Sequence, residues 1–387
     1  MSDLKFKNKT VCVHSGELKD LEYKGAVSPL YMSTSYAFEG VDSKRYPRYF
    51  NTPNQTSLAK RIAALEKGEK GLIFSSGMAA ISSSLFSNLE SGNHVIFQND
   101  LYGGTRNFIK KQFPKYGIEF SFSKGLKFSD FQKEVKSNTV GIYIETPSNP
   151  LLKIINLKEI SEFAKDKRFW TIIDNTFASP VNQNPINFGI DMVVHSATKY
   201  LGGHSDICSG AVVSSSFYIN KIHDHAKNFG GSPSEFSTWL LERSVKTVFL
   251  RVEEQNKNAM NLAKFLQQNE FVLSVNYPGL ESHPDHFIAK SQMHGGFGGI
   301  LSFEINKNID ASKFLKALRL IKPTTSLGGV ESTLIIPKSA SHALLSDIER
   351  RDQGISDNLI RLSVGIEDIE DIKLDLINSL NFAADES

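Results

Sequence analysis

The segments Trp170-Thr-Ile-Ile-Asp174-Asn-Thr-Phe177 and Met192-Val-Val-His195-Ser-Ala-Thr-Lys199 decide the fold class. In each, an apolar run with the length of a buried strand ends in polar residues. The pattern also occurs upstream, in segments 71–80, 94–102 and 141–150. Because helical stretches separate these runs, the chain is predicted to form a mainly parallel α/β sheet. Such sheets bind ligands outside the carboxyl ends of their strands, where all five polar segments would lie.

The rest of the chain is predicted to be organised around this sheet. Residues 1–55 are rich in turn formers and aromatic residues, and we expect an extended arm that does not fold on itself. Residues 56–245 would form the α/β domain. Residues 246–387 would form a smaller C-terminal α+β domain, with strands at 299–305 and 359–364.

Apolar residues at helical spacing predict two helices of interest. Leu58, Ile62 and Leu65 recur at this spacing and stop at Gly68, which predicts a helix with a glycine C-cap. Residues 234–268 carry a longer helical pattern, whose length suits a spine between the two domains.

Composition excludes several classes of protein. The 387 residues suffice for about two domains, and 40% hydrophobic and 22% charged residues exclude a disordered chain. Lys and Arg number 44 against 42 Asp and Glu, which gives no large field to attract nucleic acid or an anionic membrane. No apolar run reaches membrane-spanning length, and residues 1–10, which contain no apolar core, are not expected to act as a signal peptide. With only Cys12 and Cys208 present, a reducing compartment, the cytoplasm, is expected.

The segment before Lys199 suits an aldehyde cofactor. An ε-amine at a strand end can form a Schiff base once it has lost its proton. Ser196 and Thr198 flank it with hydroxyls that suit phosphate oxygens. Taken alone, however, the segment more often describes a solvated loop lysine.

Two further strand ends suit the same cofactor. Asp174 could pair with a pyridinium nitrogen, although a helix N-cap is an alternative use of this residue. In Ser75-Ser-Gly77-Met-Ala-Ala80, a glycine and a helix N-terminus could approach a phosphate, although a plain tight turn fits equally well.

Tyr102 and Arg361 are two further candidate binding residues. Tyr102 could stack on a planar ring, and Arg361 could bind a carboxylate through two hydrogen bonds. A core or surface tyrosine, and an ion pair of Arg361 with Glu367 or Asp368, are the ordinary alternatives. A phosphate cradle, ring stacker, pyridinium partner and Schiff-base lysine therefore occur in order at successive strand ends, which predicts pyridoxal 5'-phosphate (PLP) as cofactor.

The chain also resembles the Cys/Met-metabolism PLP enzymes, from about Thr10 to the last helix. This family includes cystathionine γ-synthase, the cystathionine β- and γ-lyases, methionine γ-lyase and the O-acetylhomoserine sulfhydrylases. The motifs that carry the resemblance are SSGMAA at 75–80, DLYGGT at 100–105, ETPSNP at 145–150, DNTFASP at 174–180, HSATKYLGGHSD at 195–206, YPGLESHP at 277–284, SLGGVES at 326–332 and LIRLSVGIED at 359–368.

The resemblance implies a PLP-dependent transferase fold of type I, similar to aspartate aminotransferase, and a homotetramer that shares its active sites between subunits. It implies that Lys199 carries the cofactor and takes the substrate's Cα proton, with Tyr102 stacked on the ring and assisting, and Asp174 on the ring nitrogen. The implied phosphate ligands are Gly77, Met78, Ser196 and Thr198, with Tyr46 and Arg48 of a neighbouring subunit. The implied ligands of the substrate's α-carboxylate are Asn149, Ser326 and Arg361.

Two departures from the family pattern bear on the substrate. The usual Tyr-x-Arg-x-Gly-Asn-Pro-Thr is replaced by residues 46–54, with one residue inserted and the glycine lost. The glutamate that commonly precedes Ser-Leu-Gly-Gly in γ-enzymes is Thr325 here, so a carboxylate for a distal ammonium is missing. The predicted activity is therefore that of a cystathionine β-lyase, which converts L-cystathionine to homocysteine, pyruvate and ammonia, with slow alanine racemisation as a side activity.

The sequence leaves other functions open. A γ-synthase or γ-lyase is the nearest, followed by an O-acetylhomoserine sulfhydrylase. A nicotinamide-dependent oxidoreductase would need Gly295-Gly-Phe-Gly-Gly299 as its dinucleotide loop, but the pattern fails at Leu301. No metal site is predicted, because His223-Asp-His225 and His283-Pro-Asp-His286 lie in polar, surface-like stretches.

Overall fold

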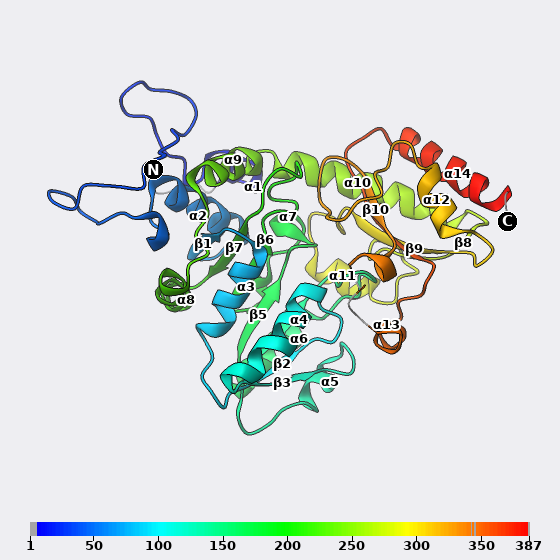
Figure 1. The fold of residues 1–387 in the computed structure, drawn as a ribbon, viewed down its shortest axis with the longest axis horizontal. Helices are drawn as coiled ribbons and strands as arrows, with labels where there is room; N and C mark the ends of the chain where they lie inside the picture. Colours follow the sequence, from blue (N-terminus) through cyan, green and yellow to red (C-terminus); the bar gives the residue numbers. More distant parts are fainter. Residues whose placement is uncertain (1–5, 342, 344–345, 386–387) are drawn as a thin grey trace.

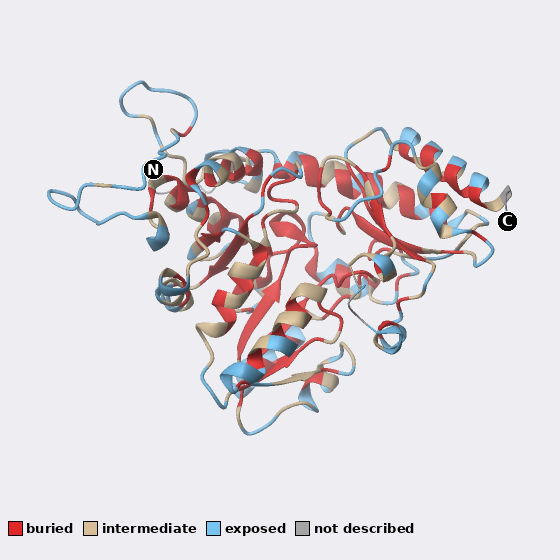
Figure 2. Ribbon diagram, viewed as in Figure 1, coloured by how far each residue is buried: buried red, intermediate tan, exposed pale blue. Residues whose placement is uncertain are grey.

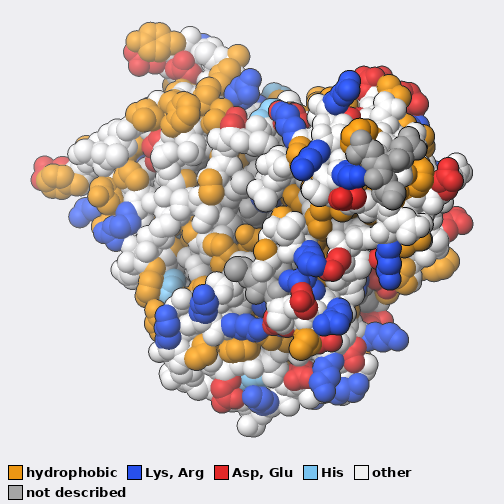
Figure 3. Space-filling view, turned by 45° about the vertical axis from the view of Figure 1, so that its right-hand side comes forward, with side chains coloured by type: hydrophobic (Ala, Val, Ile, Leu, Met, Phe, Trp, Pro, Cys, Tyr) orange, Lys and Arg blue, Asp and Glu red, His pale blue; other side chains and the backbone are white. Residues whose placement is uncertain are grey.

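The computed structural model describes residues 6–341, 343 and 346–385. Its strands form two separate sheets, which lie on either side of the centre of the molecule (Figure 1). Within the described residues, no helix is long and apolar enough to cross a membrane. On the face shown in Figure 3, acidic and basic side chains are interspersed, and the net charge of the chain is +2.

The larger sheet has seven strands in the order β1-β7-β6-β5-β4-β2-β3. Their bounds are Lys70–Phe74 (β1), His94–Phe97 (β2), Glu119–Phe122 (β3), Thr139–Glu145 (β4), Trp170–Asp174 (β5), Met192–Ser196 (β6) and Gly210–Ser214 (β7). From β6 to β3 all neighbours are parallel, whereas β7 pairs antiparallel with both β1 and β6. The prediction of a mainly parallel α/β sheet is confirmed, and all five apolar runs are strands.

Helices cover both faces of this sheet, which explains why its strands are continuous apolar runs (Figure 2). Leu72 and Phe74 of β1 pack with α3 (Gly77–Phe86), α4 (Gly103–Gln112) and α8 (Ser216–Phe229) in one core cluster. Ile73, between them, points to the other face, towards α2 (Pro53–Glu66). Further along that second face, α6 (Leu157–Lys167) packs on β4 and β5.

The smaller sheet is antiparallel throughout, with the order β10-β11-β9-β8. Its strands are Val272–Asn276 (β8), Ile300–Ile305 (β9), Thr333–Ile335 (β10) and Leu359–Ser363 (β11). It shares a core with α12 (Ala311–Ala317) and α14 (Ile369–Asp385). Both predicted C-terminal strands are present. The remaining short helices are α5 (Phe128–Gln132), α7 (Ser179–Asn182), α11 (His286–Gln292) and α13 (Asp347–Gln353).

The long helix predicted over residues 234–268 is wrong, because the structure divides it into α9 (Glu235–Val245) and α10 (Val248–Gln267). At the break, Thr247 has φ −107° and ψ 7°, outside the α-helical range. The Ser244 carbonyl accepts from Thr247 N–H and from Nη2 of the buried Arg251. These bonds satisfy the carbonyl that a continuous helix would pair with residue 248.

Two smaller expectations also need correction. The left-handed residue that ends α2 is Lys67 (φ 65°), not Gly68. Gly68 is required instead by packing, because a Cβ there would lie 2.3 Å from Val213 Cγ1. The arm is not wholly extended either: Asn8–His14 form α1, whose Cys12 is buried and whose carbonyls accept from the buried Arg61. Residues 15–46 contain neither helix nor strand.

Candidate active site

Side chains from both sheets meet beside the carboxyl ends of the parallel strands. β5 and β6 end at Asp174 and Ser196, and a turn after β6 carries Lys199. Arg361 lies in β11 of the smaller sheet, and Ser326 lies in the loop before β10. The structure therefore joins residues that the sequence separates by more than 100 positions.

Lys199 Nζ donates a hydrogen bond of 2.8 Å to Ser326 Oγ. Partial burial, and then the positive charge of Arg361, lower the pKa of the Lys199 ammonium. The amine therefore loses its proton more readily than an exposed lysine. This property is what a lysine needs in order to attack an aldehyde.

Asp174 is buried at the end of β5 and is oriented by one neighbour, Thr176. Its Oδ1 accepts from Thr176 N–H at 3.0 Å and from Thr176 Oγ1 at 2.5 Å. Burial raises the pKa of this carboxyl, while the Thr176 bonds oppose the rise. No Lys or Arg among the described residues is recorded in an ion pair with Asp174, and its Oδ2 carries no recorded hydrogen bond. A cation such as a protonated ring nitrogen could therefore bind Oδ2, which Thr176 leaves free.

The N-terminus of α3 approaches the end of β6 closely. Ser76 caps the helix by accepting from Ala79 and Ala80 N–H, whereas Gly77 and Met78 N–H bond to no described residue. A Cβ on Gly77 would lie 2.9 Å from Cα and Cβ of Ser196, so only glycine allows this approach. Two free N–H groups beside a serine hydroxyl form a suitable phosphate cradle.

Thr198 follows Ser196 by two residues, in the turn after β6. Its Oγ1 donates to the Ser209 carbonyl at 3.1 Å and accepts from Ser209 N–H at 3.0 Å. These bonds tie the turn that carries Lys199 to the start of β7. The predicted phosphate ligands of this chain are thus brought together.

Arg361 is almost fully buried, at 4% exposure, and is not part of a surface ion pair. Nη1 donates to Asn149 Oδ1 at 3.2 Å, and Nη2 donates to the Ser326 carbonyl at 2.9 Å. Burial lowers the pKa of Arg361 to about 10, and its Nε is buried without a partner among the described residues. The structure therefore gathers all three predicted carboxylate ligands.

Tyr102 is held by its backbone, and its side chain stays 44% exposed. Its N–H donates to Glu145 Oε2 at 2.9 Å, and its ring folds over Gly104, where a Cβ would lie 2.5 Å from Cε1. Glu145 was not among the predicted site residues. It ends β4 as Asp174 ends β5, and the two pair in register, so its position at a strand end was the signal that could have found it.

Burial, and then the charge of Asp174, raise the pKa of Glu145 well above its usual value. A second unpredicted contact lies on the far side of β6, where His195 Nε2 is 2.5 Å from Glu66 Oε1. Both of these residues are buried. Glu66 is on α2, and nothing in the local sequence indicates this pairing.

Tyr46 and Arg48 do not reach these residues within one chain. Both are exposed, and Arg48 Nη1 donates to the Lys227 carbonyl of α8. Arg48 also lies over the rings of Tyr46 and Tyr49. Among the described residues, neither side chain contacts the surroundings of Lys199.

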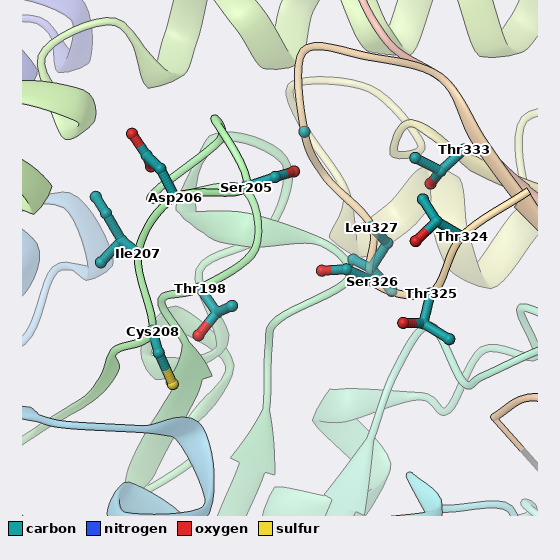
Figure 4. A pocket seen from close by; sticks show the side chains of 11 residues that line it. Thr198, Ser205, Asp206, Ile207, Cys208, Thr324, Thr325, Ser326, Leu327 and Thr333 are labelled. Carbon is teal, nitrogen blue, oxygen red and sulfur yellow. The ribbon is translucent and has the colours of Figure 1, made fainter. Parts of the chain in front are cut away.

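A pocket of about 450 Å³ opens between the Lys199 turn and the loop before β10 (Figure 4). Its wall consists largely of hydroxyl-bearing and small residues, namely Thr198, Ser205, Asp206, Ile207, Cys208, Thr324, Thr325, Ser326, Leu327, Gly329 and Thr333. Asp206 is the acidic residue of this wall, and Figure 4 shows its carboxylate directed away from Thr325 and Ser326. The hydroxyls of Thr325 and Ser326 face the pocket.

The segment Gly295–Gly299 does not form a dinucleotide loop. It lies between α11 and β9, outside the parallel sheet, and a Cβ on Gly295 would lie 2.2 Å from the Val181 carbonyl. Gly295 thus allows close packing against α7, and Gly296 allows close packing against Asn256 of α10, rather than against a pyrophosphate. Within the part of the chain that the structure describes, no three His, Cys, Asp or Glu side chains cluster as metal ligands.

Comparison with known proteins agrees with this arrangement. Residues 9–381 match the family model described as Cys/Met metabolism PLP-dependent enzyme. The chain is 41% identical to cystathionine gamma-lyase of Bacillus subtilis (strain 168), covering 97% of this chain and 99% of that protein. It is 42% identical to cystathionine beta-lyase of Lactococcus lactis subsp. cremoris (strain MG1363), covering 96% and 98%.

A solved structure extends the likeness to three dimensions. Cystathionine gamma synthase from Xanthomonas oryzae pv. oryzae, in complex with cystathionine, matches with a TM-score of 0.94. The two chains are 35% identical, and the match covers 99% of this chain and 100% of the other.

Proposed function

The chain belongs to the Cys/Met metabolism PLP-dependent enzyme family, and from this premise we propose that it is a cystathionine β-lyase. Membership makes it a PLP-dependent carbon–sulfur lyase with the fold of that family. The proposed substrate is L-cystathionine, cleaved to homocysteine, pyruvate and ammonia. The observation that carries this choice is Thr325, whose hydroxyl faces the pocket where γ-enzymes commonly have a carboxylate.

The residues at the strand ends fit PLP. Asp174 has a buried carboxylate whose Oδ2 is free for the ring nitrogen, and Gly77 and Met78 have free N–H groups for the phosphate. Ser196 and Thr198 add hydroxyls, Tyr102 would cover the ring, and Lys199 would bind the cofactor covalently. When bound, PLP withdraws electrons from the bonds to the substrate's Cα.

The protein's own groups would bind the substrate and move one proton. Arg361 and Asn149 would hold the α-carboxylate, which fixes the Cα–H bond relative to Lys199. Lys199 Nζ, whose pKa is lowered by burial and by Arg361, would take the Cα proton with Tyr102 beside it. In a β-elimination, the thiol then departs from Cβ without removal of a second proton.

The wall of the pocket supports β- rather than γ-chemistry. γ-Chemistry requires a second proton removal, at Cβ, and tight control of the distal group of the substrate. Thr324, Thr325 and Thr333 present hydroxyls to this region, and Asp206 is turned away. Hydroxyl groups hold a distal ammonium only weakly compared with a carboxylate directed at it.

Product identification tests the proposal directly. With L-cystathionine as substrate, pyruvate and homocysteine are expected as products. Release of 2-oxobutyrate and cysteine would identify a γ-lyase instead, and turnover only with an O-acyl-homoserine and cysteine would identify a γ-synthase. Slow racemisation of L-alanine remains a prediction, which unchanged optical rotation after long incubation would contradict.

A second test concerns the covalent bond to Lys199. The purified protein supplied with PLP should be yellow, and borohydride should remove this absorbance and leave a reduced label on the peptide that contains Lys199. Lys199→Ala should carry no label after the same treatment. Labelling of another lysine would contradict the assignment.

We further propose that Tyr46 and Arg48 bind the phosphate in a neighbouring subunit of a homotetramer. Their exposure in the single chain supports this, as do the exposed apolar side chains of the same arm, Leu21, Tyr23, Met32 and Phe38. Light scattering would give the subunit number. Arg48→Ala and Lys199→Ala subunits mixed in equal amounts should regain about a quarter of wild-type activity, because about half of the pairs are mixed and each mixed pair contains one complete site of two. No recovery from stable mixed pairs would contradict the shared site.

A further inference from the structure

Helix α13 of the C-terminal region contacts α4, the helix that begins directly after Tyr102. Glu349 Oε1 of α13 lies 2.7 Å from Lys110 Nζ and 3.7 Å from Arg106 Nη2, both on α4. The two partners differ in environment, since the Lys110 side chain is 45% exposed and that of Arg106 is 10% exposed. Glu349 is therefore the carboxylate that faces a largely buried guanidinium.

The Arg106 side chain also binds the loop that carries Tyr102. Its Nη1 donates to the Asn99 carbonyl at 2.8 Å and to Asn99 Oδ1 at 3.1 Å. Its backbone N–H donates to the Tyr102 carbonyl at 3.0 Å. Its guanidinium also stacks on the Phe122 ring, 4.2 Å from the centroid, so the side chain has little freedom. A shift of the Arg106 side chain would move the Asn99 end of the Asn99–Tyr102 segment, while the backbone bond ties the Tyr102 end to the first turn of α4.

A second side chain of α13 reaches the same point. The buried Gln353 donates from Nε2 to the Asn99 carbonyl at 3.4 Å, and the Gln353 carbonyl accepts from Lys153 Nζ at 3.2 Å. Two residues of one helix, four positions apart, thus converge on Asn99. A solvent-exposed ion pair alone would not require a second residue of α13 to bind the Asn99 carbonyl.

We infer that Glu349 is a positioning residue, which sets the place of the Tyr102 ring through Arg106 and Asn99. The inference rests on the proposed function, in which Tyr102 covers the cofactor ring and stands beside the transferred proton. The backbone of Tyr102 is held from the other side by Glu145. Glu349 supplies the opposing constraint from the smaller sheet's side of the site.

The capping of α13 permits a clean substitution. Glu349 is the N3 residue of a capping box with Ser346 at the N-cap. At the start of α2, Gln55 performs the same role with Thr52. Glu349→Gln therefore removes the charge while the cap can be kept.

The test measures kcat and KM for L-cystathionine with the PLP-loaded enzyme, together with the circular dichroism of the visible cofactor band. Glu349→Gln is expected to lower kcat about 3- to 10-fold, with KM changed less than about twofold, because a displaced catalytic group affects the chemical step most. The cofactor band should change in intensity, since the stacked ring contributes to its asymmetry. The PLP content should stay at its wild-type value, and the melting temperature should fall by only a few degrees, as expected on loss of a partly exposed ion pair.

Two variants serve as controls. Lys110→Gln removes the shorter but exposed contact of Glu349 and should leave kcat and the cofactor band unchanged. Glu254→Gln breaks a comparable exposed pair with Lys257 on α10, 3.0 Å long, far along the chain from this site, and should also have no effect. If Lys110→Gln matches the effect of Glu349→Gln, the route through Arg106 is wrong.

The remaining outcomes are also decisive. Wild-type kcat and an unchanged cofactor band in Glu349→Gln would overturn the inference. Loss of activity only in parallel with melting temperature or PLP content would assign Glu349 a structural role and overturn it too. Tyr102→Ala, which removes the ring, separates the two levels: if this variant has wild-type kcat and spectrum, the role of Tyr102 in the proposed function fails, whatever Glu349 does.

Discussion

The hydrogen bond of 2.8 Å from Lys199 Nζ to Ser326 Oγ connects residues 127 positions apart. Ser326 lies in the loop before β10, and its carbonyl accepts from Arg361 of β11 at 2.9 Å. One residue therefore contacts both the group that would hold the cofactor and the group that would hold the substrate's carboxylate. Ser326 also has φ 81°, a left-handed conformation that is unfavourable for a residue with a side chain.

This geometry predicts separable effects of the Ser326 hydroxyl and of its backbone. Ser326→Ala and Ser326→Gly should both lower kcat about fivefold, because each removes one hydrogen bond to the lysine amine. The free energy of unfolding of Ser326→Ala should be about 1 kcal/mol lower than that of Ser326→Gly, since only glycine adopts φ 81° without strain. Steady-state kinetics and chemical denaturation give the two quantities. Wild-type kcat in Ser326→Gly would show that the hydroxyl is dispensable.

Asp174 and Asp191 offer a matched pair of variants at opposite ends of β5. Asp174 Oδ1 accepts from N–H and Oγ1 of Thr176, and Asp191 Oδ2 accepts from the same two groups of Thr171. Burial raises the pKa of both carboxyls. They differ in that only Asp174 stands at the carboxyl ends of the strands.

Asp174→Asn should therefore lower kcat by about 100-fold or more and shift the visible absorbance of the bound cofactor, because an amide cannot stabilise a protonated ring nitrogen. Asp191→Asn should lower the melting temperature about as much as Asp174→Asn does, but leave kcat within about twofold of the wild-type value. The measurements are kcat, the absorbance spectrum and the melting temperature. Equal losses of activity in the two variants would contradict the assignment of Asp174 to the ring.

Part of this architecture could be predicted from the sequence. The apolar runs at β1, β2, β4, β5 and β6 identified the sheet, because strands covered on both faces are apolar throughout. The residues at their carboxyl ends then pointed to one edge of the sheet. The antiparallel pairing of β7 with β1 and β6 carried no such signal, since periodicity shows burial but not strand direction.

Features that depend on distant contacts were not predictable. The break between α9 and α10 follows from Arg251, which donates to the Ser244 carbonyl and also binds the Tyr200 carbonyl near the site. The pairing of Glu66 with His195 likewise spans 129 positions. The roles of Tyr46 and Arg48 remain predictions, because a single chain does not place a neighbouring subunit.

Glu145 should act as a neutral hydrogen-bonding group. Burial and the nearby Asp174 raise its pKa well above the usual value, so it keeps its proton at pH values where an exposed glutamate is ionised. Glu145→Gln should then keep kcat within about twofold, because an amide replaces a carboxylic acid of the same shape and still accepts from Tyr102 N–H. Glu145→Ala should lower kcat about tenfold, since it leaves that N–H without its acceptor. A loss in Glu145→Gln as large as in Glu145→Ala would show that the charge is needed.

His94, at the start of β2, should make stability depend on pH. It is fully buried between Thr139 Oγ1, at 2.8 Å from Nδ1, and Ser121 Oγ, at 3.0 Å from Nε2. Burial, and then the charge of Lys136, lower its pKa from 6.5 to about 4. Between these two values the unfolded chain binds a proton that the folded protein does not.

Stability therefore falls as the pH falls through this window, and is unaffected by His94 above it. From about pH 7.5 to about pH 5, the free energy of unfolding should fall by about 2 kcal/mol on account of His94 alone. His94→Gln has no titrating group, so its stability relative to wild type should improve by that amount over the same interval, whatever its value at neutral pH. Chemical denaturation of both proteins at the two pH values measures the difference. Parallel pH curves would mean that His94 is protonated as easily in the folded protein as in the unfolded chain.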